Sequence, residues 1–217
     1  MRRVSVAGKR EHRKRQTKLA ILEAAVHLFT AQGYERTSIT DLAREAGIGK
    51  GTIYSYFRKK SEIFLAFCEE QLEVTRTAIV QTESSSLPLL DRLLAIYRLD
   101  FQFIHQNPEF GRLLMRETFF PLELHEEQSR HLDNRYIALL VPLLKNAQLQ
   151  GELRHDLELT LVLGHFYGLY IMVVSAWFTG RLLSEEDVLM ALHALFEQAL
   201  QGLAPSRSYS SSRASCV

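Results

Sequence analysis

Apolar residues recur along most of the chain at steps of three and four positions, which is the spacing of an amphipathic helix. Between Thr17 and Gly33, for example, Ile21, Ala25 and Phe29 form one such stripe. Comparable segments, separated by glycine, proline or serine-rich breaks, predict an all-α fold. We expect helices over residues 17–33, 38–46, 50–56, 61–82, 88–106, 108–119, 122–150, 157–179 and 184–202.

Composition and element length divide the chain into four parts. Residues 1–16 are too polar to join a core, so we expect a disordered basic arm. Residues 204–217 form a low-complexity, serine-rich tail that we also expect to be disordered. Between them, residues 17–64 hold short helices and residues 65–203 hold longer ones. The sequence therefore predicts a small N-terminal domain followed by a larger helical domain.

The formal net charge of +1 conceals a strong asymmetry along the chain. Residues 1–70 carry 14 Lys and Arg against 8 Asp and Glu, whereas residues 71–217 carry 12 against 17. Residues 1–18 alone hold eight basic side chains and a single acidic one, Glu11. A basic end on an acidic body favours a polyanionic partner at that end. The alternative is a solvated tail that only improves solubility.

The side chains do not suggest an enzyme or a metal site. The eight histidines are scattered without ligand spacing, and the sequence has no phosphate-binding glycine loop or nucleophile elbow. We therefore expect no catalytic activity, no cofactor and no metal. Cys68 and Cys216 make no disulfide framework, and no apolar stretch follows the basic N-terminus as it would in a secretory signal. These features favour a cytoplasmic protein.

The segment from Leu159 to Gly180 has no Asp, Glu, Lys or Arg and is long enough to cross a bilayer. It contains Gly164 and Gly168, which are spaced as in closely packed membrane helices. Its His, Tyr, Thr and Ser residues suit lipid poorly, and no basic cluster flanks it. We favour a central helix wrapped by others, with the two glycines at a close crossing. The alternative is a helical membrane-associated protein or a protein-interaction module.

Residues 38–56 combine a short helix, a turn at Gly47 and a second short helix. Ser38 followed by Asp41 predicts a capping box at the start of the first helix. In a helix-turn-helix unit, the second helix enters the major groove of DNA. The second helix here carries hydroxyl groups, a lysine and a glycine but no acidic residue, so phosphates and base edges are suitable partners.

Residues 18–64 resemble the DNA-binding domain of the tetracycline-repressor (TetR/AcrR) family. The remainder of the chain is similar to that family only in its length and helix content. The matching positions are Ile21-Leu22-x-Ala24-Ala25-x-x-Leu28-Phe29-x-x-x-Gly33-Tyr34, then Thr37-Ser38-Ile39-x-x-Leu42-Ala43-x-x-Ala46-Gly47-Ile48-x-Lys50-Gly51-Thr52-Ile53-Tyr54-x-Tyr56-Phe57, then Lys59-Lys60-Ser61.

The resemblance implies a DNA-binding transcriptional regulator, most often a repressor, that binds a palindromic operator as a homodimer and is released by a small effector. Activation instead of repression stays open. The residues that the resemblance places at the DNA are Ser38, Thr40, Lys50, Gly51, Thr52, Tyr54, Ser55, Tyr56 and Lys60. The residues that it places in the core are Ile39, Leu42, Ala43, Ile48, Ile53 and Phe57.

The resemblance also implies an effector pocket in the larger domain. We expect a mostly apolar effector, either an acyl compound or a hydrophobic drug. His165 draws attention because a buried imidazole needs a hydrogen-bond partner. The candidate pocket residues, each of which packing alone would also explain, are Phe101, His105, Met115, His165, Tyr170 and Trp177.

Two further expectations concern surfaces. The last two helices are expected to pair across a two-fold axis, using Gly164, Gly168 and the apolar stripe from Val188 to Leu203. The basic arm is expected to follow DNA phosphates or to enter the minor groove, and removing residues 2–15 should then weaken the salt dependence of DNA binding.

Overall fold

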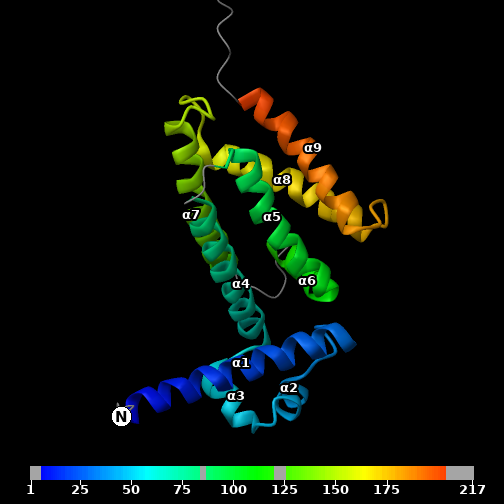
Figure 1. The fold of residues 1–217 in the computed structure, drawn as a ribbon. Helices are drawn as coiled ribbons and strands as arrows, with labels where there is room; N and C mark the ends of the chain where they lie inside the picture. Colours follow the sequence, from blue (N-terminus) through cyan, green and yellow to red (C-terminus); the bar gives the residue numbers. More distant parts are fainter. Residues whose placement is uncertain (1–5, 84–86, 120–125, 204–217) are drawn as a thin grey trace, which may run out of the picture. The chain divides into compact units, whose positions relative to one another are not determined.

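The computed structural model describes residues 6–83, 87–119 and 126–203. Within these ranges every long regular element is an α-helix (Figure 1), which confirms the predicted all-α fold. Most helix ends lie within a few residues of the predicted ones. The helices are α1 (Val6–Gln32), α2 (Ile39–Glu45), α3 (Lys50–Tyr56), α4 (Lys60–Glu83), α5 (Leu89–Gln106), α6 (Pro108–Phe119), α7 (Glu126–Leu149), α8 (Leu159–Phe178) and α9 (Glu185–Leu203).

Packing divides the chain into two compact units. The first comprises Met1–Ala78 and Arg98–Tyr136, and the second comprises Ile79–Tyr97 and Ile137–Val217. The division falls inside α4, α5 and α7, so each of these helices contributes residues to both units. The predicted border after residue 64 separates a DNA-binding part from an effector-binding part and does not coincide with the division by packing. It stays a prediction.

The core of the first unit is rich in aromatic side chains. Phe110 of α6 contacts the rings of Phe29, Phe64 and Phe67, with ring centroids 6.1, 5.0 and 4.2 Å apart. Phe29 belongs to α1, and the other two belong to α4. Burying large aromatic side chains provides much of the stabilisation in such a core. The cluster therefore holds α1, α4 and α6 together.

The first helix begins much earlier than expected. α1 starts at Val6, so the prediction of a disordered arm was wrong for residues 6–16. These residues are rich in Lys, Arg, Glu and Gln, which are good helix formers, and no proline interrupts them. A helix that is already formed by its buried half extends into such a segment at little cost. Residues 1–5 and the predicted tail at 204–217 lie outside the described residues.

In the second unit, α8 and α9 pack side by side (Figure 1). Phe196 of α9 is fully buried, with ring centroids 5.1 Å from Phe166 and 5.1 Å from Tyr97. Val188 and Leu192 are buried on the same side of α9. These residues belong to the stripe that was expected on the dimer surface. That expectation was wrong for them, because the chain's own core already covers them.

Only one face of α8 is buried. The buried residues are Val162, Leu163, Phe166, Tyr170, Val173 and Val174. Leu161, Gly164, His165, Gly168 and Met172 recur at helical steps on the other side and are exposed. The expectations of a helix wrapped on all sides and of a buried His165 were therefore wrong within this chain, because the chain covers only one of the two apolar faces.

The glycines of α8 do not mark a helix crossing within the chain. A Cβ atom placed on Gly164 or Gly168 would meet no heavy atom within 4 Å outside its own helix backbone and chain neighbours. Among the described residues, α8 is also the helix that is long and apolar enough to cross a membrane, with a mean hydropathy of 1.7. The core helix of a soluble protein meets the same criterion.

Candidate nucleic-acid interface

The start of α2 is fixed by the predicted capping box. The backbone N–H of Asp41 donates to Ser38 Oγ at 3.2 Å, and the Asp41 carboxylate accepts from the Ser38 backbone N–H at 3.0 Å. The Ser38 hydroxyl also donates to that carboxylate at 2.6 Å. These hydrogen bonds from Ser38 lower the pKa of the Asp41 carboxyl group. Both hydrogen-bond donors of Ser38, the backbone N–H and the hydroxyl, are thus used in capping α2. A DNA contact from Ser38 competes with this role.

A glycine turn redirects the chain between α2 and α3. Gly47 has a φ of +65°, a conformation that side chains with a Cβ disfavour. The backbone N–H groups of Gly47 and Ile48 donate to the carbonyl groups of Arg44 and Ala43 at 3.2 and 3.0 Å. These bonds close the end of α2 in the manner of a glycine C-cap. The turn thereby places α3 against α2 at a fixed angle.

The orientation of α3 is determined by one buried residue. Ile53 is fully enclosed in the core, and Phe57, directly after the helix, is buried as well. A helix of seven residues that is anchored at its centre can bury only one side. Tyr54 is 54% exposed. The exposed residues of α3 are Lys50, Gly51, Thr52, Tyr54 and Ser55.

The exposed groups of α3 differ in their hydrogen bonding. The Ser55 hydroxyl donates to the carbonyl of Thr52 at 2.7 Å, so its proton is used within the helix. The Lys50 ammonium and the hydroxyls of Thr52 and Tyr54 have no partner among the residues that the structure describes. These three groups are therefore the ones that α3 offers to an external hydrogen-bonding surface.

The remaining predicted contacts lie beside this face. Thr40 is exposed in the first turn of α2. Tyr56 is half-buried, with its ring centroid 6.4 Å from that of Phe57, so only part of its ring is accessible. Lys60 begins α4, and its Nζ donates to the Tyr34 carbonyl at 2.6 Å and lies 4.0 Å from the centre of the Tyr34 ring. Lys60 thus joins α4 to the loop before α2.

The residues expected in the core are found there. Leu42, Ala43, Ile53 and Phe57 are buried, and Ile39 and Ile48 are half-buried against the same cluster.

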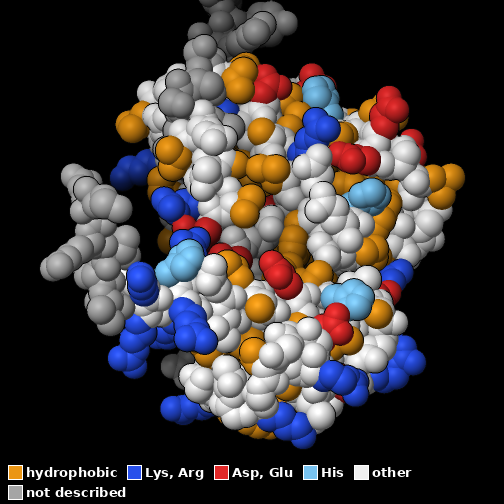
Figure 2. Space-filling model, turned by 60° about the horizontal axis from the view of Figure 1, so that its bottom comes forward, with side chains coloured by type: hydrophobic (Ala, Val, Ile, Leu, Met, Phe, Trp, Pro, Cys, Tyr) orange, Lys and Arg blue, Asp and Glu red, His pale blue; other side chains and the backbone are white. Residues whose placement is uncertain are grey.

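Basic side chains that the sequence-based set leaves out also flank α3. Arg58 is exposed and is the second residue after α3. The run of basic residues from 58 to 60 could have indicated it from the sequence. Arg44 of α2 is exposed and pairs with Asp41, with 2.6 Å between Nη2 and Oδ1. Figure 2 shows Lys and Arg side chains at several points around the surface that includes α1–α3. α3 itself has no acidic side chain. The electrostatics of this face therefore suit a polyanion.

The candidate effector residues belong to both units. In the first unit, Phe101 is buried and lies 5.7 Å from the exposed His105 ring, and Met115 is half-buried. In the second unit, Tyr170 is buried with its ring 5.0 Å from Tyr97, Trp177 is half-buried, and His165 is exposed. Phe101 and Tyr170 are thus the enclosed aromatic residues of this set.

Residues 21–67, which contain α2, the glycine turn and α3, match the family described as bacterial regulatory proteins, tetR family. The domain formed by these residues is a tetR-family DNA-binding domain. The chain is accordingly a transcriptional regulator of the helix-turn-helix class, and α3 occupies the position of the second helix of that motif.

Relatives of this regulator extend over both units. The chain is 27% identical to the HTH-type transcriptional regulator SrpR of Pseudomonas putida, over 71% of each chain. It is 23% identical to the fatty acid metabolism regulator protein of Bacillus subtilis, over 88% of this chain and 97% of the relative. The crystal structure of the transcriptional regulator FadR from Bacillus subtilis in complex with stearoyl-CoA has the same fold. It superposes with a TM-score of 0.72 at 19% identity, over 85% of this chain and 98% of FadR.

Proposed function

We propose that this regulator is a homodimeric repressor that reads a palindromic operator with α3 and is released by a small, mostly apolar effector. The observation that carries the proposal is the outward face of α3. Ile53 is buried while Lys50, Thr52 and Tyr54 are exposed, and the exposed face has no acidic side chain. A surface helix without an ion pair or an apolar stripe of its own is suited to the major groove.

The chemistry of each exposed group assigns it a partner on DNA. The Lys50 ammonium suits phosphate oxygens or the O6 and N7 atoms of guanine. The methyl group of Thr52 and the ring of Tyr54 suit the methyl group of thymine, and their hydroxyls suit base edges or phosphates. Gly51 has no side chain to hold the backbone away from DNA. Thr40, Arg58 and Lys60 lie at the margins, where contacts to the sugar-phosphate backbone position the helix.

The open face of α8 supports a dimer. Leu161 and Met172 are exposed on this face, and Gly164 and Gly168 between them leave room for close approach. A second copy of the same uncharged face is self-complementary across a two-fold axis. Such a dimer presents two copies of α3, which read half-sites separated by whole turns of DNA. In this proposal the protein acts on DNA in the cytoplasm.

The relatives support an acyl compound as the effector. FadR is described in complex with stearoyl-CoA, and a second relative is a fatty acid metabolism regulator. Phe101 of the first unit and Tyr170 of the second unit are separate candidates for contact with an acyl chain, since each ring is buried. An effector that prefers another separation of the two α3 helices lowers operator affinity, typically by about 1–3 kcal/mol of coupling.

The test begins with selection of operator sequences from a random duplex library by the full-length protein. We expect an inverted repeat bound by two chains. Lys50→Ala and Tyr54→Ala should each weaken binding by about 1–3 kcal/mol per lost contact, counted twice in a dimer. Lys145→Ala, an exposed basic residue of α7, is the matched control and should bind as the wild type does. Unchanged affinity of both α3 variants would refute the proposed reading helix.

The effector assignment is tested separately. Stearoyl-CoA is titrated into the preformed operator complex, with free coenzyme A and stearate as controls. We expect release of DNA by the thioester at concentrations that leave the circular dichroism of the protein unchanged. If the complex survives saturating stearoyl-CoA, the acyl-thioester assignment is wrong, while the operator result stands on its own.

A further inference from the structure

The N-terminal part of α1 lies outside the matched part of the family, which begins at residue 21. Residues 9–18, which we term the basic extension, continue the helix that carries the buried Ile21 and Phe29. Every residue from 8 to 16 is exposed. The extension is therefore a surface helix that packs its side chains against no other described element until residue 17.

Apart from Lys18, the basic side chains of the extension are unpaired among the described residues. Lys9, Arg10, Arg13, Lys14 and Arg15 form no ion pair with any residue that the structure describes. Elsewhere in the described residues several arginines do pair with carboxylates, namely Arg44, Arg76, Arg112, Arg116, Arg135 and Arg154.

The spacing places four of these charges, all but that of Arg15, on one side of the helix. Lys9 and Arg13 are four residues apart, and so are Arg10 and Lys14, so each pair consists of like-charged neighbours on the helix surface. Such pairs weaken an isolated helix, because the two like charges repel. A polyanion that binds along this side reverses that repulsion. The charge pattern therefore points to an anionic surface as long as the helix.

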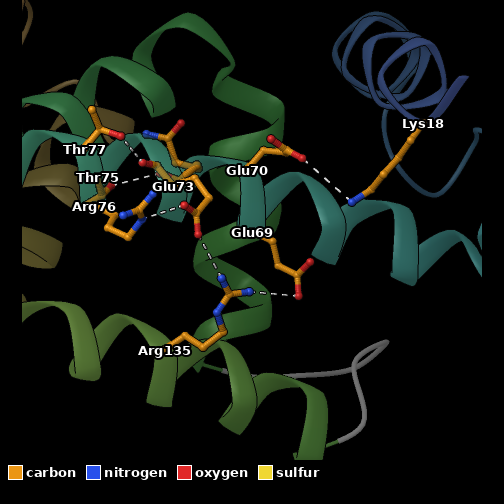
Figure 3. Close-up of polar contacts among 9 residues, drawn as sticks. Lys18, Glu69, Glu70, Glu73, Thr75, Arg76, Thr77 and Arg135 are labelled. Carbon is orange, nitrogen blue, oxygen red and sulfur yellow. Dashed lines mark hydrogen bonds and ion pairs between the residues drawn. The ribbon is translucent and has the colours of Figure 1, made fainter. Parts of the chain in front are cut away.

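The extension has a defined direction relative to α3, because both belong to the first unit. Its C-terminal end is fixed by Lys18, whose Nζ lies 3.9 Å from Glu70 of α4 (Figure 3). At about 1.5 Å per residue, the basic extension is about 15 Å long, which corresponds to about four base pairs of duplex DNA. A helix of this length is long enough to lie along several phosphates of one strand.

We propose that the basic extension binds the phosphodiester backbone of DNA that flanks the half-site read by α3, as a helix and without reading sequence. This inference rests on the proposed DNA-binding function. The helical form decides between the two modes expected for an arm. A helix about 10–12 Å in diameter does not fit a minor groove about 6 Å wide, whereas phosphates lie along the outside of the duplex.

The experiment compares Lys9→Gln/Arg13→Gln with Lys145→Gln/Arg181→Gln in the full-length protein. The second variant removes two exposed basic side chains of the second unit and is the matched control. Affinity is measured against salt concentration on two operator duplexes, one ending at the half-sites and one with ten additional base pairs on each side. We expect the first variant to lower the slope of log K against log[salt] by about 2–4, since each phosphate contact contributes about 0.9. It should also lose the extra affinity that the longer duplex gives the wild type.

A second variant tests the helical form. His12→Pro retains every Lys and Arg but interrupts α1, and His12→Ala is its control. We expect His12→Pro to lose most of the additional affinity for the longer duplex. If the segment instead bound DNA as a flexible arm, the proline would leave that additional affinity unchanged. An equal slope for the wild type and Lys9→Gln/Arg13→Gln overturns the inference, and so does an unaffected His12→Pro. In both cases selective binding of the short operator still supports the proposed function. If the wild type selects no sequence, the proposed function itself fails and the inference fails with it.

Discussion

The hydroxyl group of Tyr136 lies 3.0 Å from Oδ2 of Asp100 and so connects α7 to α5. The other carboxylate oxygen, Oδ1, accepts from the hydroxyl of Thr75 on α4 at 3.0 Å. One carboxyl group therefore joins three helices of the first unit. Close by, Arg135 of α7 also bridges to Glu73 of α4 (Figure 3), with 3.4 Å between Nη2 and Oε1.

The stability of the protein should depend on pH through Asp100. Burial raises the pKa of this carboxyl group from 3.8 to about 6, although the hydrogen bonds from Thr75 and Tyr136 act in the opposite direction. The folded state holds this proton more tightly than the unfolded state, so its contribution to the free energy of unfolding falls as the pH rises from about 4 to about 6. The change is on the order of 1 kcal/mol for each pH unit in that interval.

Asp100→Asn removes the ionising group. Urea unfolding between about pH 4 and pH 7 should show the stability of Asp100→Asn increasing relative to the wild type as the pH rises. Asp91→Asn alters an exposed carboxylate of the same helix and should retain the wild-type profile. Parallel profiles for Asp100→Asn and the wild type would show that Asp100 has an ordinary pKa.

Two glycines of the reading motif should separate stability from DNA binding. Gly47→Ala places a Cβ at a φ of +65° and should lower stability by about 1–2 kcal/mol. Gly51→Ala lies in helical backbone with open space around it, so stability should rise by about 0.5–1 kcal/mol. The added methyl group of Gly51→Ala faces outward and should weaken operator affinity. Thermal unfolding and DNA titration of both variants measure these effects, and a Gly47→Ala protein as stable as the wild type would contradict the strain argument.

The open face of α8 can be tested by charge. A Cβ atom at Gly168 meets no described atom within 4 Å outside its own helix backbone and chain neighbours, so in Gly168→Glu the far-UV circular dichroism and the melting temperature should remain close to those of the wild type. Burying the new carboxylate in a dimer interface would be costly, so sedimentation should show a monomer. Leu149→Glu alters a residue that is 74% exposed at the end of α7 and should leave the mass unchanged. If Gly168→Glu is still a dimer, this face is not the dimer interface. If the wild-type protein sediments as a monomer and binds lipid vesicles, the face instead contacts a membrane.

A buried ion pair should stabilise the start of α5. Arg92 is 2% exposed and pairs with Glu152, whose other oxygen accepts the backbone N–H of Leu89 at 2.5 Å. Glu152→Ala leaves the guanidinium buried without its carboxylate and should cost about 3–5 kcal/mol in denaturant unfolding. Asp156→Ala removes the exposed partner of Arg154 in the same connection and should cost less than about 1 kcal/mol. Similar losses in the two variants would mean that the pair with Arg92 is not specially stabilising.

Much of the reading motif could be predicted because its rules are local. The cap formed by Ser38 and Asp41, the turn at Gly47 and the inward position of Ile53 each depend on residues a few positions apart. Hydrogen bonds within the motif were harder to predict from the sequence. The attachment of Lys60 to Tyr34 and the use of the Ser55 hydroxyl inside α3 depend on atomic positions that a residue pattern does not contain.

The helices, their order and the outward face of α3 were determined by the sequence itself, because periodicity, caps and glycines act within about one helical turn. Only the tertiary structure decided that the basic segment before residue 17 is helical, that α9 buries its apolar stripe, and that α8 keeps a second apolar face open. The physical reason is that burial depends on which distant helices meet. An apolar stripe in the sequence indicates that one face of a helix is buried against something. Only the packing of the whole chain determines whether that face is buried in the chain's own core.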